Sequence, residues 1–285
     1  MAGASLNDIK SRVKSVKGTM QITKAMELVA ISKLRRAKER AEKARPFHKI
    51  LRAAIDKIEG SGEIASSVWS ASTPGERTLF VVIAGDRGLA GGYNSNVFRL
   101  TDALSRDTVA SYLPVGKKVL ERYKRQESEI YASIPYVDDA SVGDALSLAE
   151  RISEDFKSGK FDRVVAVYTH FTSMIAQTPV YEQILPLEPG EEGAKEKKNF
   201  SYDPIYAGEP EEILEKIVPT YVGGILHSAI LESLASESGA RRMAMNAANK
   251  NAEEIINTLM LRYNRARQAV ITQEITEIVS GSEAL

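Results

Sequence analysis

The fold is decided by residues 9–58, which read IKSRVKSVKGTMQITKAMELVAISKLRRAKERAEKARPFHKILRAAIDKI. Fifteen positions in this stretch are spaced alternately four and three residues apart, and twelve of them are apolar. Thr23, Glu27 and His48 are the polar exceptions. A seam of this kind is typical of a long coiled-coil helix. The apolar positions are Ile9, Val13, Val16, Met20, Ala30, Leu34, Ala37, Ala41, Ala44, Leu51, Ile55 and Ile58.

A similar seam returns near the C-terminus, so the first helix has a candidate partner at the other end of the chain. Its positions are Met245, Ala248, Ala252, Ile256, Leu259, Tyr263, Ala266 and Val270. At ~1.5 Å per residue, a helix over residues 5–59 would be roughly 80 Å long and one over residues 209–280 roughly 105 Å. No compact domain is that long, so neither stripe can be buried locally. We therefore expect the two helices to pair as an antiparallel rod.

The segment between the two helices predicts a separate α/β domain. Residues 78–84 (TLFVVIA) and 109–115 read as buried strands, and a helical pattern follows each of them. A further strand over residues 162–171 precedes residues 177–185, which we expect to pair with it in antiparallel fashion. Alternating strands and helices favour a mainly parallel sheet.

The predicted fold class is α/β plus a long antiparallel coiled coil, with a central Rossmann-like α/β domain. We expect coiled-coil helices over residues 1–59 and 209–285, with the α/β domain over residues 77–207. Pro46 and Pro219 lie inside the helical patterns, and each is expected to bend or interrupt its helix.

Composition limits the classes of function. Lys plus Arg and Asp plus Glu number 38 each, but residues 1–59 hold fifteen basic against six acidic side chains. Residues 241–268 hold six against two, so the basic rod predicts an acidic partner. There is no cysteine, which excludes disulfides and thiolate metal sites. No apolar run approaches the ~20 residues of a membrane span, and no signal peptide is evident, so we expect a soluble, cytoplasmic protein.

No catalytic set can be assembled from the sequence. The glycine-rich segment 85–92 follows the first strand, where a dinucleotide-binding turn would lie, but it matches neither G-x-G-x-x-G nor a P-loop. We favour a structural turn there over a nucleotide site. His48, His170 and His227 are far apart in the sequence, so we expect no metal site and no cofactor.

The C-terminal end carries an apolar stripe that the N-terminal helix cannot reach, because that helix starts only near residue 5. An exposed apolar helix end of this kind needs a socket in a partner. This apolar tip consists of Ile271, Ile275, Ile278 and Val279.

Both ends of the chain resemble the gamma subunit of F-type ATP synthases of the bacterial type. Residues 22–30 read ITKAMELVA, and residues 263–281 read YNRARQAVITQEITEIVSG. The motif LASE at residues 234–237 is also similar to the family. Residues 86–92, DRGLAGG, look like the family's loop, with Ala90 where some members carry cysteine.

The resemblance implies a non-catalytic rotor subunit. Its shaft would stand inside a hexamer of alpha and beta subunits, and its α/β domain would lie at the foot, against the epsilon subunit and the membrane c-ring. Ion flow would turn the ring and the shaft, which would drive the catalytic beta subunits through their conformations during ATP synthesis or hydrolysis. Such a subunit binds no nucleic acid and touches the membrane only through the c-ring. It is a peripheral part of the F1 sector at the cytoplasmic face of the cell membrane.

The resemblance also assigns roles to residues that match the family's motifs. The apolar tip becomes the end that turns in a bearing, and Tyr206 becomes a foot contact with epsilon and the c-ring. Contact with the beta subunits falls on Lys24, Met26, Arg267, Gln268 and Thr272.

Two other classes stay open on the residues alone. The basic run over residues 33–45 could place a coiled-coil protein on nucleic acid, with binding that depends on salt. Glu39 and Glu42 interrupt that run and the seam passes through it, which favours the charged outer face of a packed rod. A nucleotide-dependent enzyme built on the α/β domain is the other alternative, and nucleotide would stabilise it.

Overall fold

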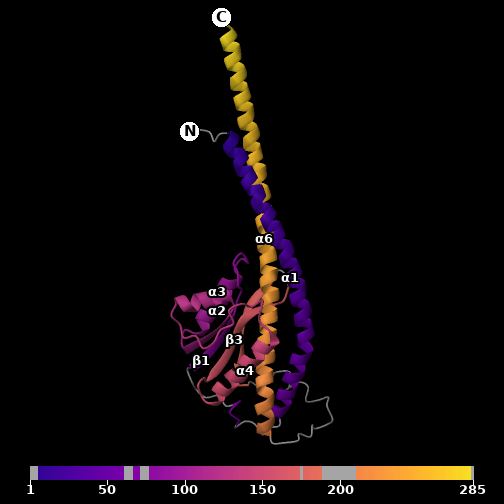
Figure 1. Ribbon diagram of the computed structural model, residues 1–285, viewed down its shortest axis with the longest axis vertical. Helices are drawn as coiled ribbons and strands as arrows, with labels where there is room; N and C mark the ends of the chain where they lie inside the picture. The colour runs from indigo at the N-terminus through magenta and orange to yellow at the C-terminus, as the bar shows by residue number, and fades with distance from the viewer. Residues whose placement is uncertain (1–5, 61–66, 71–76, 174–175, 188–209, 284–285) are drawn as a thin grey trace. The chain divides into compact units, whose positions relative to one another are not determined.

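The computed structural model describes residues 6–60, 67–70, 77–173, 176–187 and 210–283. Two helices are much longer than the others: α1 (Leu6–Gly60, 55 residues) and α6 (Pro210–Glu283, 74 residues) (Figure 1). The order of elements between them is β1, α2, β2, α3, α4, β3 and β4. The strand and helix alternation expected from the sequence is therefore confirmed.

By its internal contacts the chain divides into two units, to which each long helix contributes a part. The coiled-coil unit comprises residues 1–30 and 241–285, and the sheet unit comprises residues 31–240. The domain boundaries expected from the sequence stay a prediction.

The sheet unit holds four strands in the order β2-β1-β3-β4. The central strand β1 is parallel to both β2 and β3, and the edge strand β4 is antiparallel to β3, as the sequence predicted. The strands are β1 (Arg77–Ile83), β2 (Val109–Val115), β3 (Arg163–Phe171) and β4 (Gln177–Leu185). The helices between them are α2 (Tyr93–Leu104), α3 (Lys117–Arg125) and α4 (Val142–Lys157).

Helices cover both faces of this sheet, because its strands are apolar on both sides (Figure 1). The face that carries Val81 and Leu113 packs against α4 and α6. The opposite face, with Phe80, Val82 and Val165, packs against α2 and α3. The result is a three-layer α/β/α arrangement of the Rossmann-like class.

The start of α4 shows how local chemistry fixes an element. Ser141 Oγ accepts a hydrogen bond from the Asp144 backbone N–H at 3.1 Å, and Asp144 Oδ2 accepts one from the Ser141 N–H at 2.9 Å. This reciprocal pair is a capping box, which satisfies N–H groups that a helix start leaves unpaired.

The two long helices pair in antiparallel fashion inside the sheet unit. Leu34 and Ala37 of α1 form a buried cluster with Ala235 of α6. Further along α1, Arg52 Nη1 donates to the Tyr221 hydroxyl at 2.6 Å. Residues further along α1 therefore contact residues nearer the start of α6, as an antiparallel pair requires.

Small side chains on α6 let this helix approach strand β3 closely. Ser236 Oγ donates to the Thr169 carbonyl at 3.0 Å, and Ser233 Oγ accepts from the Thr169 N–H at 3.4 Å. Both serines are buried. The hydroxyl groups that α6 buries against the sheet, those of Ser233 and Ser236, are therefore hydrogen-bonded.

Two expectations from the sequence need correction, and one residue of a predicted loop has a buried side chain. Helices α1 and α6 run unbroken through Pro46 and Pro219, because a proline removes only one backbone donor; neither residue interrupts its helix, and the expected bend stays a prediction. Val270 is 41% exposed, so the C-terminal seam ends near Ala266. Trp69, in a segment read only as loop, is buried and stacks on a phenylalanine of α4.

One described helical segment, Glu211–Ser280, is long and apolar enough to cross a membrane by length and composition, and 56% of its most apolar window is buried inside the protein. Leu214, Val218 and Val222 of α6 are fully buried in the core of the sheet unit. We therefore interpret its apolar character as that of a core helix.

Replacing Ala37 with Leu should destabilise the protein by roughly 1–3 kcal/mol, because the larger side chain overpacks the cluster with Leu34 and Ala235. Ala53→Leu, at an exposed position of the same helix, is the matched control. It should change the free energy of unfolding by less than about 0.5 kcal/mol. Urea unfolding followed by circular dichroism measures both variants. Equal stabilities would show that the seam register is wrong.

The ion pair between Arg77 and Asp162 should make stability depend on pH. The guanidinium donates to both carboxylate oxygens, at 2.8 and 3.1 Å, and these hydrogen bonds hold the pKa of Asp162 below its usual value. The stabilisation is therefore complete above the unfolded pKa of about 3.9 and is lost as pH falls through the folded pKa.

Asp162→Asn should lower stability at neutral pH by about 1–2 kcal/mol. It should also flatten the fall in unfolding free energy from about pH 5 to pH 2. The measurement is urea unfolding across that range, with Asp107→Asn, at an exposed position, as control. Parallel pH profiles for parent and Asp162→Asn would contradict the assignment.

Candidate functional sites on the coiled coil and at the end of β1

The coiled-coil unit contains a polar layer in an otherwise apolar seam. Asn249 Nδ2 donates to Glu27 Oε2 at 2.9 Å, and Asn246 Nδ2 donates to Glu27 Oε1 at 3.3 Å. Thr23 Oγ1 is hydrogen-bonded to Asn249 Oδ1. Two polar exceptions in the first seam thus meet amides of the other helix. We call Thr23, Glu27, Asn246 and Asn249 the polar layer.

Above and below this layer the seam is apolar. Ile9, Val13 and Ala30 of α1 are buried, as are Met245 and Ala252 of α6. Polar groups inside a coiled coil fix the register of the two helices, because every other register leaves them unpaired. The polar layer can therefore hold the two helices in one alignment.

The residues expected to contact a beta subunit all belong to the coiled-coil unit. Lys24 is exposed and Met26 is half-buried on α1. On α6, Arg267, Gln268 and Thr272 are exposed, and Thr272 Oγ1 donates to the Gln268 carbonyl at 2.9 Å. Four of the five are thus exposed to solvent, and their contact with a beta subunit stays a prediction.

The apolar tip lies on the part of α6 that continues past the start of α1 (Figure 1). Ile275 and Ile278 are 57% and 72% exposed, and Ile271 and Val279 are exposed as well. Every residue from 267 to 280 is exposed. Tyr206, the expected foot contact, lies outside the described residues.

Sequence analysis missed a second set of exposed apolar side chains on the coiled-coil unit. Ile22, Leu28 and Val29 of α1 are each more than half exposed, as is Leu261 of α6. The signal that reveals them is simple: they are apolar residues that fall outside the seam spacing. Contiguous exposed apolar side chains are typical of surfaces that bind a partner, whereas isolated ones are common on any protein.

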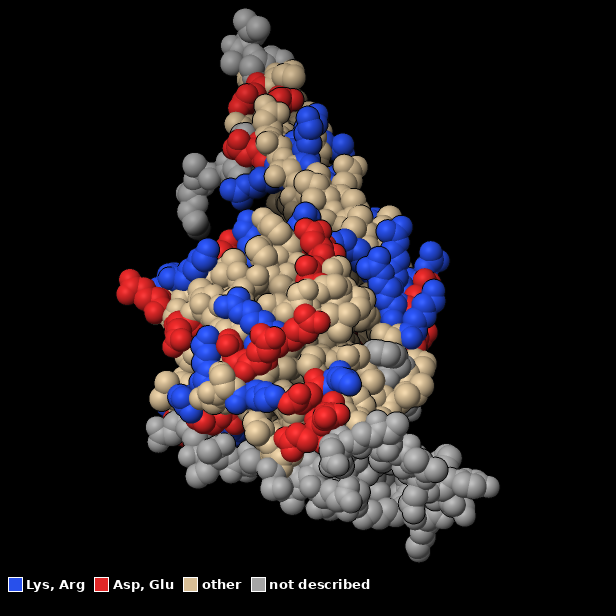
Figure 2. Space-filling view, turned by 60° about the horizontal axis from the view of Figure 1, so that its bottom comes forward, with Lys and Arg blue, Asp and Glu red and all other residues tan. Residues whose placement is uncertain are grey.

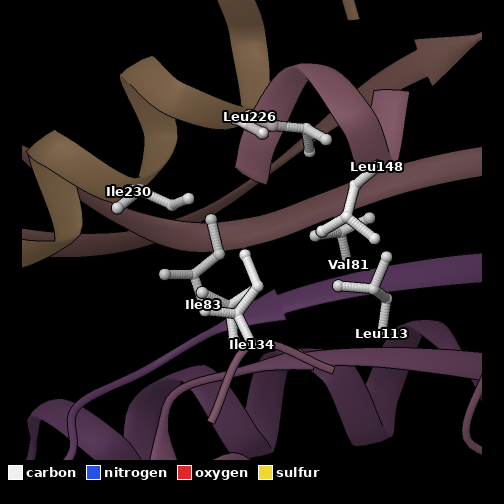
Figure 3. A pocket seen from close by; sticks show the side chains of 9 residues that line it. Val81, Ile83, Leu113, Ile134, Leu148, Leu226 and Ile230 are labelled. Atoms are coloured by element: carbon white, nitrogen blue, oxygen red, sulfur yellow. The ribbon is translucent and has the colours of Figure 1, made fainter. Parts of the chain in front are cut away.

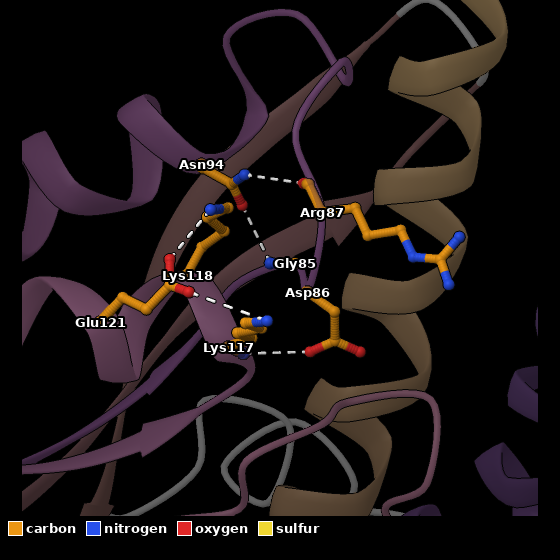
Figure 4. Close-up of polar contacts among 7 residues, drawn as sticks. All are labelled: Gly85, Asp86, Arg87, Asn94, Lys117, Lys118 and Glu121. Carbon is orange, nitrogen blue, oxygen red and sulfur yellow. Dashed lines mark hydrogen bonds and ion pairs between the residues drawn. The ribbon is translucent and has the colours of Figure 1, made fainter.

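The turn after β1 occupies the place where α/β folds of this class bind phosphate, and Figure 4 shows its contacts. Asn94 Oδ1 accepts from the Gly85 N–H at 2.9 Å, and Asn94 Nδ2 donates to the Arg87 carbonyl at 3.3 Å. The Asp86 carboxylate accepts from the Lys117 N–H, at the start of α3, at 3.0 Å. An anion of the chain itself therefore lies at this helix N-terminus.

This arrangement leaves little space for a nucleotide at the turn. A side chain at Gly85 would come within 2.6 Å of Glu237 Oε1, so a carboxylate of α6 already lies against the backbone there. A phosphate would meet two carboxylates, Asp86 and Glu237, in place of open N–H groups. The structural turn favoured by the sequence fits these contacts.

The sheet unit contains a small apolar void of about 10 Å³ (Figure 3). Its lining is entirely apolar and includes Val81 and Ile83 of β1, Leu148 of α4, and Leu226 and Ile230 of α6. A void this small and this apolar has no partners for a water molecule. It is a packing defect between the sheet and the helices and offers no site for a substrate.

Charged side chains of both signs are interspersed over most of the face shown in Figure 2. On α1, Arg35 pairs with Glu39 and Lys38 with Glu42, each at 3.7 Å and at exposed positions. Such pairs are individually weak, about 0–1 kcal/mol. They describe the outer face of a packed helix, since Leu34 on the same run is buried in the seam.

In the described part of the chain, the side chains that could bind metal do not form clusters. Among the residues that the structure describes, no group of three or more His, Asp or Glu side chains could hold a metal ion. Burial and the nearby positive charge of Arg40 lower the pKa of His227. That imidazole is therefore neutral at physiological pH.

Comparison with solved structures identifies the class of protein. The chain matches the Tetrahymena thermophila mitochondrial ATP synthase, in a structure of its central stalk and c-ring, with a TM-score of 0.64 and 26% identity. The match covers 80% of this chain and 99% of that chain. A chain of the Euglena gracilis mitochondrial ATP synthase, 19% identical with a TM-score of 0.69, covers 99% of this chain and 95% of its own length, and shows the fold alone. The fold is that of an ATP synthase central-stalk subunit.

Sequence comparison identifies the family. The family model described as ATP synthase matches residues 5–285. The ATP synthase gamma chain of Ruminococcus albus is 44% identical over 98% of each chain, and the sodium ion specific gamma chain of Acetobacterium woodii is 39% identical over 99% of each. The chain belongs to the ATP synthase gamma chain family. Neither comparison supports the nucleic-acid alternative.

Asn249→Leu should destabilise the coiled-coil unit by about 1–3 kcal/mol, because it leaves the Glu27 carboxylate with fewer donors. Asn257→Leu, at an exposed position of α6, is the matched control and should be near neutral. Adding Glu27→Leu to Asn249→Leu should recover part of the loss, because the unpaired carboxylate is then gone. Urea unfolding of all variants measures this. Additive losses in the double variant would argue against the polar layer.

Proposed function

We propose that this chain is the rotating shaft of the ATP synthase central stalk and that it catalyses no reaction itself. The observation that carries the proposal is the end of α6, which continues past α1 with every side chain from 267 to 280 exposed. An apolar helix end that is exposed over this length gains stability when another chain covers it. Membership of the gamma chain family supplies the class of that partner.

The partners we propose follow the family. The coiled-coil unit stands in a hexamer of alpha and beta subunits, and the sheet unit faces the epsilon subunit and the c-ring. The Tetrahymena structure, which contains a central stalk and a c-ring, supports this arrangement. We place the assembled complex at the membrane as a peripheral F1 sector, on its cytoplasmic face. This chain reaches the membrane only through the c-ring.

The chemistry of the shaft surface suits contacts that form and break in turn. Gln268 and Thr272 are polar and exposed, and Arg267 adds a positive charge beside them. A net hydrogen bond of this kind contributes about 0.5–1.5 kcal/mol, more if charged. Such contacts can hold the shaft at a resting angle against a beta subunit and still release it. Lys24 and Met26 make the corresponding contacts from α1.

The apolar tip has a different role, because its contacts are nonpolar. Its exposed isoleucines gain from burial in an apolar collar whatever their angle, because the hydrophobic effect is not directional. A tip of this composition is held along its axis while it turns. Tyr206 remains our proposed contact at the foot.

A crosslink at Gln268 tests the proposal, and the absence of cysteine from the chain gives a clean background. One cysteine replaces Gln268 and another is placed on the facing loop of a beta subunit, and the assembled complex is oxidised. We expect ATP hydrolysis to slow strongly and to recover on reduction. The Gln268→Cys complex without the second cysteine is the control. High crosslinking yield with unchanged turnover would exclude rotation of this part of the shaft.

A further inference from the structure

The Asp86 carboxylate binds backbone N–H groups from two separate segments of the sheet unit. Oδ1 accepts from Lys117 N at 3.0 Å and from Val137 N at 3.1 Å. Oδ2 accepts from Val137 N at 3.1 Å and from Asp138 N at 3.4 Å. One side chain therefore joins the end of β1 to the start of α3 and to the segment around residue 137.

Helix α3 needs such an anion because its own cap provides none. The N-cap residue is Gly116, at φ 108°, and it makes no side-chain hydrogen bond to the helix. A side chain there would come within 2.1 Å of the Ala84 carbonyl, so only glycine fits. The carboxylate of Asp86 supplies the missing charge at the positive end of the helix dipole.

The segment held by Asp86 reaches the N-terminal helix directly. Val137 is buried, and the next residue, Asp138, forms an ion pair with Lys33 of α1 at 2.5 Å. Both side chains of this pair are about half exposed, so the pair alone is weak. Asp86 binds the backbone N–H groups of Asp138 itself and of Val137, and so holds the backbone that carries this pair.

The other long helix contacts the same turn. The Glu237 carboxylate of α6 lies against Gly85, the residue before Asp86.

Both oxygens of Asp86 are used in hydrogen bonds to backbone, which is stiffer than side-chain contact. The end of β1 is thus tied to α1 through Asp86, the segment around Val137, and Lys33.

We propose that Asp86 is a positioning residue. Its carboxylate occupies the position at which α/β folds of this class bind phosphate, and it holds residues 137–138 so that Asp138 pairs with Lys33. It thereby transfers load between the sheet and the N-terminal helix. This role in load transfer rests on the proposed function of the chain as a shaft. The hydrogen bonds themselves do not.

The first test reads the position of the segment in the assembled ATP synthase. Lys33→Cys and Asp138→Cys are joined with a short bifunctional maleimide, in a chain that has no other cysteine. Asp86→Ala should slow crosslinking roughly tenfold, the factor expected from losing about one net charge-assisted hydrogen bond. Formate, which fits the vacated carboxylate position, should restore the rate, and chloride of equal ionic strength should not.

The second test measures the coupling of ATP hydrolysis to ion pumping, in a chain that keeps both Lys33 and Asp138. The number of ions pumped per ATP hydrolysed should fall in Asp86→Ala and fall less in Asp86→Asn. Formate should restore the ratio in Asp86→Ala. Pumping is measured as membrane potential, because formic acid crosses the bilayer without carrying charge. Asp139→Ala removes an exposed carboxylate from the same segment and is the matched control, with no change expected.

Unchanged crosslinking in Asp86→Ala would overturn the proposal. Slower crosslinking with unchanged pumping per ATP would reduce Asp86 to a structural role and would also overturn it. Neither result bears on the shaft itself, which the Gln268 crosslink tests separately. If Asp86→Ala does not assemble, Asp86→Asn keeps one acceptor oxygen and provides the same two comparisons.

Discussion

The constraint on which the structure depends is that neither long helix can bury its apolar stripe alone. A helix of 55 residues and one of 74 residues expose far more seam than any compact domain covers. Each must therefore use the other, and in both units of the chain the observed partners are residues of α1 and α6. The requirement is met with small side chains, such as Ala37 and Ala235. Because their volume is small, the two backbones can approach closely.

The same closeness explains the polar residues along the two helices. In the sheet unit, α6 lies near enough to β3 for Ser233 and Ser236 to bond with the backbone of Thr169. In the coiled-coil unit, Glu27 sits between two amides of α6. Apolar contact provides affinity that is insensitive to register, whereas these polar groups are satisfied in one alignment only. A shaft that carries load needs that single alignment.

The turn after β1 shows how a fold can resemble a nucleotide-binding fold without such a site. Its parallel strands end where phosphate commonly binds, and α3 directs its N-terminal N–H groups there. The chain fills that position with its own Asp86 carboxylate. The partial positive charge at the N-terminus of α3 is thus neutralised by a carboxylate of the chain itself, and this contact links α3 to the end of β1.

The sequence by itself determined the two long helices, their antiparallel pairing, the four strands and the exposed tip, because heptad spacing and strand patterning are local and repeat many times. It also singled out Thr23 and Glu27 as polar exceptions in the seam. Only the tertiary structure decided that Asn246 and Asn249 meet them, that Trp69 is buried, and that Asp86 caps a helix 31 positions away. The prolines within the helices belong to the same group, since the packing around Pro219 decides whether the helix continues. These facts depend on contacts between distant segments, and no local pattern of residues encodes which distant group will lie opposite.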